Sequence, residues 1–346
     1  METVLKIQQK LLPDLLEIMH GRYRILKYIR LMEPIGRRLL AAHLGMTERT
    51  LRAEIVFLKE QGLVNVSTDG MSVTLEGRHL CKQLEPIMKE ISGLKGLEQQ
   101  LKSVLDIEEV IVVAGDSDEN DLVKKEMGRA CAICMKKNFT SNNIIAITGG
   151  STLATVADML TPDAEGRDLL FLPARGGLGE HVENQANTIV AKMAEKTFGQ
   201  YKLLHVPDQV SDDVYASLIK EPAIKEIVET MSKASMVVHG IGDAIPMAKR
   251  RKTDSKTFQK ICNGRAVGEA FGYYFNENGE IIHKVTTIGF QLEFLERVPC
   301  VIAVAGGSSK AQAILAVQKQ SRGQKTTLIT DEGAAKSLIQ KQSFLK

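Results

Sequence analysis

The chain has 346 residues, 44% of them hydrophobic and 25% charged, a composition that excludes an intrinsically disordered protein and predicts two domains rather than one. Five cysteines, an odd and sparse set, exclude a disulfide framework. The apolar runs are too short for a membrane span. We therefore expect a cytoplasmic protein with no membrane partner. The net charge is only +3, but residues 20–60 hold nine lysines and arginines against four acidic residues. That excess favours binding to the DNA backbone, although charge clusters also occur on solvated helix faces.

The first part of the chain has the pattern of a DNA-reading module. We predict helices over Tyr23–Met32 and Arg37–Leu44, a tight turn at Gly45, and a third helix capped by Thr47 with Leu51 in the core. Helix, short glycine turn and helix form the helix-turn-helix pattern, whose second helix contacts bases while flanking cations contact phosphates. The predicted DNA-binding residues are Arg37, Arg38, Thr47, Glu48, Arg49, Thr50, Arg52 and Lys59.

A β-hairpin is predicted directly after the third helix. Leu63–Val66 and Ser72–Leu75 are short alternating runs on either side of Asp69-Gly70, and Asp-Gly between such runs is a strong hairpin signal. A hairpin in this position is a wing, so we predict a winged helix-turn-helix DNA-binding domain over residues 1–78. The alternative is a small α+β subdomain that binds no nucleic acid.

Residues 79–105 carry leucines and isoleucines at steps of three or four, which indicates a helix with a near-heptad apolar seam. This segment is interpreted as a linker helix that pairs subunits. An equally good interpretation is a helix that lies on the next domain, because the seam is short for a coiled coil.

From residue 106 to 346 apolar strands alternate with helical stretches, which predicts an α/β, doubly wound, Rossmann-like domain. The predicted helix is Asp121–Lys137, and residues 268–275 suggest an inserted hairpin or lid. The strand candidates are Val110–Ala114, Ile144–Thr148, Asp168–Ala174, Tyr201–Val206, Ser235–Gly240 and Val301–Ala305.

Two segments of this domain look alike: Ile144–Thr152 and Val301–Lys310 are each a strand, a Gly-Gly turn with hydroxyl residues, and the start of a helix. Such a turn directs free backbone N–H groups and a positive dipole end at an anion. Two such turns suggest a ligand with phosphate chemistry and two anionic ends. Neither turn is a P-loop, because the Gly-Lys-Ser/Thr ending is missing.

Charged residues near these turns are candidates for ligand contacts. Arg175 ends an apolar strand before two glycines, where it could hold a phosphate in a bidentate fork or form a structural salt bridge. Lys310 follows the second turn and could neutralise a phosphate. The basic run Lys249–Lys252 is by default a solvated loop, or else a second phosphate clamp. Gln185 and Glu269 could form hydrogen bonds with sugar hydroxyls, but their residue types alone are typical of ordinary surface positions.

We find no sequence evidence for metal, cofactor or enzymatic chemistry. Cys131 and Cys134 have metal-binding spacing, but they lie in a predicted helix with no second pair and are expected to be a packed helix face. No paired histidines and no Ser-His-Asp arrangement can be argued.

The motifs together resemble the SorC family of bacterial sugar-responsive transcription regulators. They are Ala146–Thr152, Leu172–Gly177, Gly240–Ala244, Val267–Ala270 and Val304–Gly307. The sensor domains of that family are similar to sugar-phosphate isomerases and glucosamine-6-phosphate deaminases. The resemblance implies a homo-oligomeric repressor of the glyceraldehyde-3-phosphate dehydrogenase operon with fructose-1,6-bisphosphate as inducer. The effector-binding residues that it implies are Gly149, Gly150, Ser151, Thr152, Arg175, Gln185, Arg250, Glu269 and Lys310.

Two other functions compete with this one. The sensor fold allows a sugar-phosphate isomerase or deaminase, although a fold does not establish an activity. The regulator could also respond to a monophosphate such as deoxyribose-5-phosphate. Whether the oligomer is a dimer or a tetramer is left open.

Overall fold

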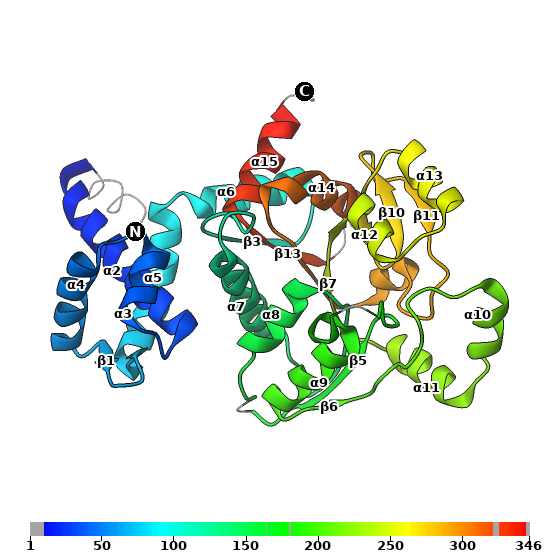
Figure 1. Cartoon of the computed structure of the whole chain (residues 1–346), viewed down its shortest axis with the longest axis horizontal. Helices are drawn as coiled ribbons and strands as arrows, with labels where there is room; N and C mark the ends of the chain where they lie inside the picture. The colour runs from blue at the N-terminus through cyan, green and yellow to red at the C-terminus, as the bar shows by residue number, and fades with distance from the viewer. Residues whose placement is uncertain (1–9, 164, 180, 321–324, 344–346) are drawn as a thin grey trace. The chain divides into compact units, whose positions relative to one another are not determined.

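A computed structural model describes residues 10–163, 165–179, 181–320 and 325–343. The chain is an α/β protein of two compact units, one ending at Gly96 and the other beginning at Leu97 (Figure 1). In the described part of the chain, no helix is both long and apolar enough to cross a membrane.

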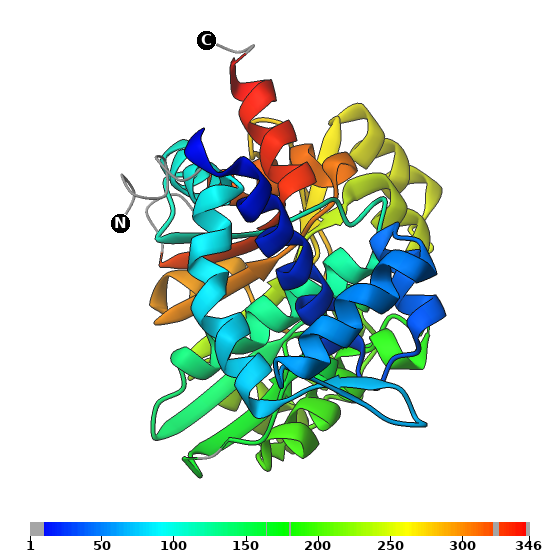
Figure 2. The ribbon, with the colours of Figure 1, turned by 90° about the vertical axis from the view of Figure 1, so that its left-hand side faces the viewer.

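The N-terminal unit contains helices α2 (Pro13–Met32), α3 (Arg37–Leu44), α4 (Glu48–Glu60) and α5 (Leu75–Ile91) and the hairpin strands β1 (Val64–Val66) and β2 (Met71–Val73). Figure 2 shows α2 lying beside α5 within this unit. The Thr47 hydroxyl accepts a hydrogen bond from the Thr50 N–H at 3.2 Å, so the predicted cap of α4 is confirmed. Leu51, Ile55 and Leu58 of α4 are buried, and β1 and β2 pair antiparallel as predicted.

The segment predicted as one linker helix is two helices. α5 ends at Ile91 and α6 spans Leu94–Leu105. Gly93 between them has a φ of +74°, a left-handed conformation that stops an α-helix. Leu101 and Leu105 are buried, and the Glu98 carboxylate accepts a hydrogen bond from the Val112 N–H at 2.9 Å. α6 therefore packs on the C-terminal unit, as the second of the two interpretations expects. Pairing of subunits through residues 79–105 stays a prediction.

The C-terminal unit is built on a parallel sheet with strand order β3-β13-β12-β7-β4-β5-β6. Five of the six predicted strands are present, but of the predicted strand Tyr201–Val206 only Tyr201 lies in a strand, the two-residue β6, and β13 was not predicted. The strands are β3 (Glu109–Val113), β4 (Asn142–Ile147), β5 (Asp168–Pro173), β6 (Gln200–Tyr201), β7 (Met236–Gly240), β12 (Cys300–Val304) and β13 (Thr326–Asp331).

Helices cover both faces of this sheet. One face carries α7 (Asp121–Lys137), α8 (Ser151–Met159) and α9 (Ala186–Thr197), and the other carries α14 (Ala311–Gln320) and α15 (Glu332–Ser343) (Figure 1). The short helices α10 (Asp212–Leu218) and α11 (Pro222–Met231) connect β6 to β7. From β4 the chain builds outward through β5 to β6, whereas from β7 it builds the opposite way through β12 to β13. The direction reverses between β4 and β7, and a crevice opens at such a point beyond the carboxyl ends of the strands.

A smaller antiparallel sheet is inserted between β7 and β12. Its order is β11-β10-β9-β8, and the prediction of an inserted hairpin at residues 268–275 is confirmed by the pairing of β9 with β10. The strands are β8 (Gly242–Asp243), β9 (Ala266–Ala270), β10 (Tyr273–Asn276) and β11 (Ile281–Lys284), and α12 (Ala244–Arg250) and α13 (Ser255–Asn263) pack beside them. Short 3-10 turns lie at η1 (Val182–Asn184), η2 (Leu292–Arg297) and η3 (Ser308–Lys310).

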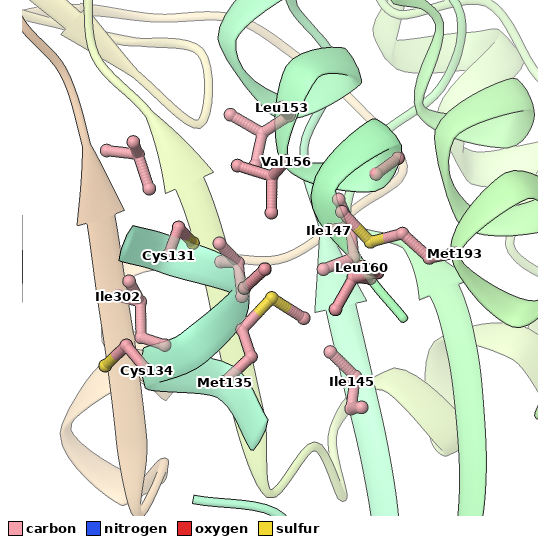
Figure 3. Packing of buried hydrophobic residues seen from close by; sticks show 14 of the residues in the cluster. Cys131, Cys134, Met135, Ile145, Ile147, Leu153, Val156, Leu160, Met193 and Ile302 are labelled. Atoms are coloured by element: carbon pink, nitrogen blue, oxygen red, sulfur yellow. The ribbon is translucent and has the colours of Figure 1, made fainter. Parts of the chain in front are cut away.

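An apolar layer lies between the main sheet and α7, α8 and α9. Cys131 and Cys134 of α7 lie in it, near Ile302 of β12 (Figure 3). Burial raises the pKa of the Cys134 thiol to about 11, so this thiol is inert at neutral pH. The interpretation of these cysteines as a packed helix face is confirmed.

Candidate functional site

A cavity opens where the sheet reverses direction. Its walls come from the loops that follow β4, β5 and β7, the start of α9, the end of α12, strand β9 and η3. All nine residues predicted to bind an effector line this one cavity: Gly149, Gly150, Ser151, Thr152, Arg175, Gln185, Arg250, Glu269 and Lys310. The fold thus brings together residues that lie up to 161 positions apart in the sequence, while their contact with a ligand stays a prediction.

The first glycine turn presents an open anion site. A side chain at Gly149 would approach the Asn184 carbonyl oxygen to 2.8 Å, so only glycine lets the turn close against η1. α8 begins at Ser151, and no acceptor for the N–H groups of Ser151, Thr152 and Leu153 is found in the described residues. Three unsatisfied N–H groups at a helix start form the positive end of the helix dipole.

The second glycine turn is not open, which corrects the prediction that both turns bind ligand. The Gly307 N–H donates to Asp331 at 2.7 Å, the Ser308 N–H to Asp116 at 3.2 Å and the Ser309 N–H to Asp118 at 2.8 Å. Carboxylates of the chain itself therefore take the place predicted for a phosphate. Lys310, which follows this turn, nevertheless lines the cavity beside the first turn.

Another part of the cavity lining, here called the arginine wall, holds two arginines and two carboxylates, here called the charged quartet: Arg175, Asp208, Arg251 and Glu269. Arg175 lies 2.8 Å from Asp208 and 3.2 Å from Glu269, and Arg251 lies 2.8 Å from Asp208 and 2.9 Å from Glu269. The four side chains are at most 6% exposed. The quartet is formally neutral, because it consists of two cations and two anions. Each cation lies beside both carboxylates.

Hydrogen bonds fix the quartet in its surroundings. Arg251 Nη1 donates to the Tyr274 hydroxyl at 2.9 Å, and the Gly272 N–H donates to Glu269 Oε1 at 2.6 Å. Burial opposes the charge of Glu269, but Arg251 and Arg175 outweigh that effect and hold the pKa of Glu269 below its usual value. Glu269 is therefore an ionised, buried carboxylate, and the prediction that it is an ordinary surface residue was wrong.

Arg175 forms structural salt bridges, which is one of the two roles that the sequence left open, while contact with a ligand stays a prediction. Its Nη2 atom lies 2.8 Å from Asp208, and its buried Nε atom donates no hydrogen bond to any described residue. In a low-dielectric wall a buried guanidinium favours an anionic partner.

The basic run lies partly in the cavity wall, as its alternative interpretation as a phosphate clamp requires. α12 ends at Arg250, which lines the cavity, while the Arg251 side chain is only 3% exposed. The default interpretation as a solvated loop is therefore wrong for these two residues. Asp208, the partner of both quartet arginines, was missed altogether; its position just beyond the predicted strand Tyr201–Val206 was a signal that could have found it.

Gln185 lies at the start of α9 and lines the cavity. A side chain at Gly177 would approach its Oε1 atom to 2.8 Å, so the glycine loop after β5 gives the Gln185 amide its space. An amide beside charged groups can both donate and accept, which suits sugar hydroxyls.

The predicted DNA-contacting face is exposed. α3 and α4 of the N-terminal unit carry Arg37, Arg38, Thr47, Glu48, Arg49, Thr50, Arg52 and Lys59, and all eight are exposed. Arg37, Arg38, Arg49 and Arg52 surround a shallow hollow between the two helices. Arg38 lies 3.5 Å from Glu48, an exposed pair that DNA phosphates could replace at little cost.

Comparison with known proteins matches both parts of the chain. Residues 18–88 match the family model "CggR N-terminal DNA binding domain", and residues 89–340 match the model "Putative sugar-binding domain". The chain is 57% identical over 340 residues to a central glycolytic genes regulator of Priestia megaterium and 56% identical over 339 residues to one of Bacillus subtilis. Each alignment covers 98% of this chain and 99% of the relative.

A solved structure supports the same assignment. The crystal structure of a SorC family transcriptional regulator from Enterococcus faecalis is 42% identical to this chain, covers 70% of it and 99% of its own length, and superimposes with a TM-score of 0.67. The curated relatives are regulators rather than enzymes. The chain belongs to the SorC family of transcriptional regulators, with an N-terminal DNA-binding domain and a C-terminal sugar-binding domain.

Proposed function

We propose that this regulator represses central glycolytic genes, the glyceraldehyde-3-phosphate dehydrogenase operon among them, and that fructose-1,6-bisphosphate in the cavity is its inducer. The names of the curated relatives support the glycolytic assignment. The cavity supports the ligand class, because its lining contains Lys310 and the open glycine turn in one part and Arg250 and Arg175 in another.

Two groups of lining residues match the two phosphates of a hexose bisphosphate. The open N–H groups at the start of α8 and the Lys310 ammonium would receive one phosphate. Arg250 and Arg175 would receive the other phosphate. Gln185 and Glu269 also line the cavity, and their amide and carboxylate suit the sugar hydroxyls. The presence of these two cationic groups in one cavity is the observation that carries the proposal, and it replaces the second glycine turn with arginines as the second phosphate site.

The N-terminal unit is proposed to be a winged helix-turn-helix in which α4 enters the major groove and the β1–β2 hairpin is the wing. The exposed face of α4 and the arginines of α3 support this assignment. A homo-oligomer would bind paired half-sites about one helical turn apart. Induction then requires that the effector bind the DNA-free state more tightly, and DNA must weaken effector binding by the same factor.

The test is a fluorescence-anisotropy titration of the full-length protein onto its own promoter DNA at fixed salt, with and without millimolar fructose-1,6-bisphosphate. Tight binding that weakens or loses cooperativity with this sugar supports the proposal. Tight binding that responds only to fructose-6-phosphate or deoxyribose-5-phosphate would replace the effector, and absence of specific binding would contradict the repressor assignment.

A Lys310→Met variant links the response to the cavity. We expect it to bind DNA like the wild type without sugar but to need about tenfold more effector for release, because one charge-assisted contact to a phosphate is lost. An unchanged dose response would show that the effector does not use this wall.

A further inference from the structure

The anion site at the start of α8 has a cation behind it that does not line the cavity. Lys124 belongs to α7, which packs along α8 (Figure 1). Its Nζ atom donates a hydrogen bond to the Ser151 hydroxyl at 2.7 Å. Ser151 is the first residue of α8 and does line the cavity.

This contact fixes the direction of the Ser151 proton. A hydroxyl oxygen that accepts from an ammonium has its own O–H left to donate. Among the residues that the structure describes, no acceptor for that proton is found. The proton is therefore available to a group in the cavity, and the ammonium behind it strengthens the hydroxyl as a donor.

The electrostatics of this wall point to a multiply charged anion. Within the described part of the chain, Lys124 and Lys310 form no ion pair with a carboxylate, although every cation of the charged quartet does. The two ammoniums repel each other, and burial together with Lys310 lowers the pKa of Lys124. This site thus holds two ammoniums and three N–H groups that form no ion pair or hydrogen bond with a described carboxylate, although Asp121 attracts Lys124 and Asp243 attracts Lys310 from a longer distance.

We propose that Lys124 is a positioning residue of the phosphate site at the start of α8, which acts through Ser151 by turning this hydroxyl into an obligate donor for a phosphate dianion. The inference deepens the proposed function, on which it rests, by adding a residue behind the cavity wall. Lys310 contacts the ligand directly, and Lys124 contacts only the residue that does.

The test measures binding of fructose-1,6-bisphosphate to the full-length protein by isothermal titration calorimetry in a double-mutant cycle. Lys124→Met and Ser151→Ala are each expected to weaken binding about tenfold, the size of one charge-assisted hydrogen bond. The double variant is expected to lie within about threefold of Ser151→Ala alone, because the two residues act in series.

Two further variants separate this role from a structural one. Lys124→Arg is expected to restore binding to within about threefold of the wild type, since a guanidinium can donate to the same oxygen. Lys125→Met removes the same charge one residue further along α7, where no hydrogen bond to α8 is recorded in the described chain, and is expected to bind like the wild type.

The outcomes are distinct. Full additivity of Lys124→Met and Ser151→Ala would overturn the relay, and so would wild-type affinity of Lys124→Met or an equal loss in Lys125→Met. A wild-type protein that binds no sugar phosphate would instead contradict the proposed function itself. Wild-type DNA affinity of Lys124→Met without effector shows that the variant is folded. If Lys124→Met loses this DNA affinity, the effector affinities of Ser151→Ala and Lys124→Arg still test the coupling between Lys124 and Ser151.

Discussion

Replacing Arg251 by methionine tests whether the charged quartet holds the effector cavity together. The variant leaves Asp208 and Glu269 facing Arg175 alone, so a buried neutral group becomes a buried anion. The Arg251 side chain is only 3% exposed and contacts both carboxylates and Tyr274. Removal of one partner from a buried ion pair costs about 3–5 kcal/mol. We expect the sugar-binding unit to be destabilised by that amount.

Hydrogen exchange of the β12 amides under native conditions measures this change within one unit. β12 lies in the middle of the main sheet, so its amides exchange mainly through global opening of the C-terminal unit. A loss of about 3 kcal/mol corresponds to exchange roughly 100-fold faster. Lys249→Met is the matched control, because Lys249 lies two residues earlier in the same run and is exposed.

Restoring neutrality should recover part of the loss. Adding Glu269→Gln to Arg251→Met leaves one cation facing one anion, so the double variant should exchange more slowly than Arg251→Met alone. In the single variant the deficit should also shrink as the pH falls from about 7 to 5, because a proton can then neutralise the carboxylate that lost its partner. Equal exchange in Arg251→Met and Lys249→Met, or a double variant worse than the single, would refute this account of the quartet.

The remaining predictions concern the DNA face, the second glycine turn and a buried histidine. Arg49→Ala and Arg52→Ala should each weaken operator binding. If the lost contact is to a phosphate, the slope of log affinity against log salt concentration should also be smaller by about one. If both variants keep the wild-type affinity and slope, the assignment of α4 as the DNA-reading helix is contradicted. Asp116→Asn with Asp118→Asn should lower the unfolding free energy by about 1–3 kcal/mol without weakening effector affinity, which calorimetry and urea titration check. Burial lowers the pKa of His239 from 6.5 to about 4, so the unfolded state takes up the proton first, and stability falls as pH drops through this window. His239→Gln should flatten that fall in acid titrations, and an unaltered slope would exclude His239 as its source.

The elements with clear periodicity could be predicted from the sequence. α7 has the predicted bounds Asp121–Lys137, because its apolar positions recur at helical spacing and Asn120 caps it. β13 was missed because four of its six residues are threonine or aspartate, although all six are buried. Its burial comes from the neighbours β3 and β12 on both sides, which a local pattern does not contain.

The site could be predicted in part for a similar reason. Glycine turns after apolar strands are a local signal, and they led to the first turn, Gly149-Gly150. Whether such a turn is empty depends on what the rest of the chain places against it, and Asp116 and Asp118 lie about 190 residues before the turn that they fill. Likewise, the local sequence around Glu269 does not distinguish it from a surface residue, because its burial depends on ion pairs with Arg175 and Arg251.

The distribution of charge in the cavity assigns the association of an anionic ligand and the discrimination between ligands to different residues. The lysine wall, formed by Lys310 with Lys124 behind it, carries ammoniums that form no ion pair in the described chain, and its attraction extends to roughly one Debye length, about 8 Å at physiological salt. The neutral quartet exerts almost none at that distance and acts only through contact. Ionic strength should therefore change how fast an anionic sugar arrives, whereas discrimination between one sugar phosphate and another is decided at the arginine wall, after arrival.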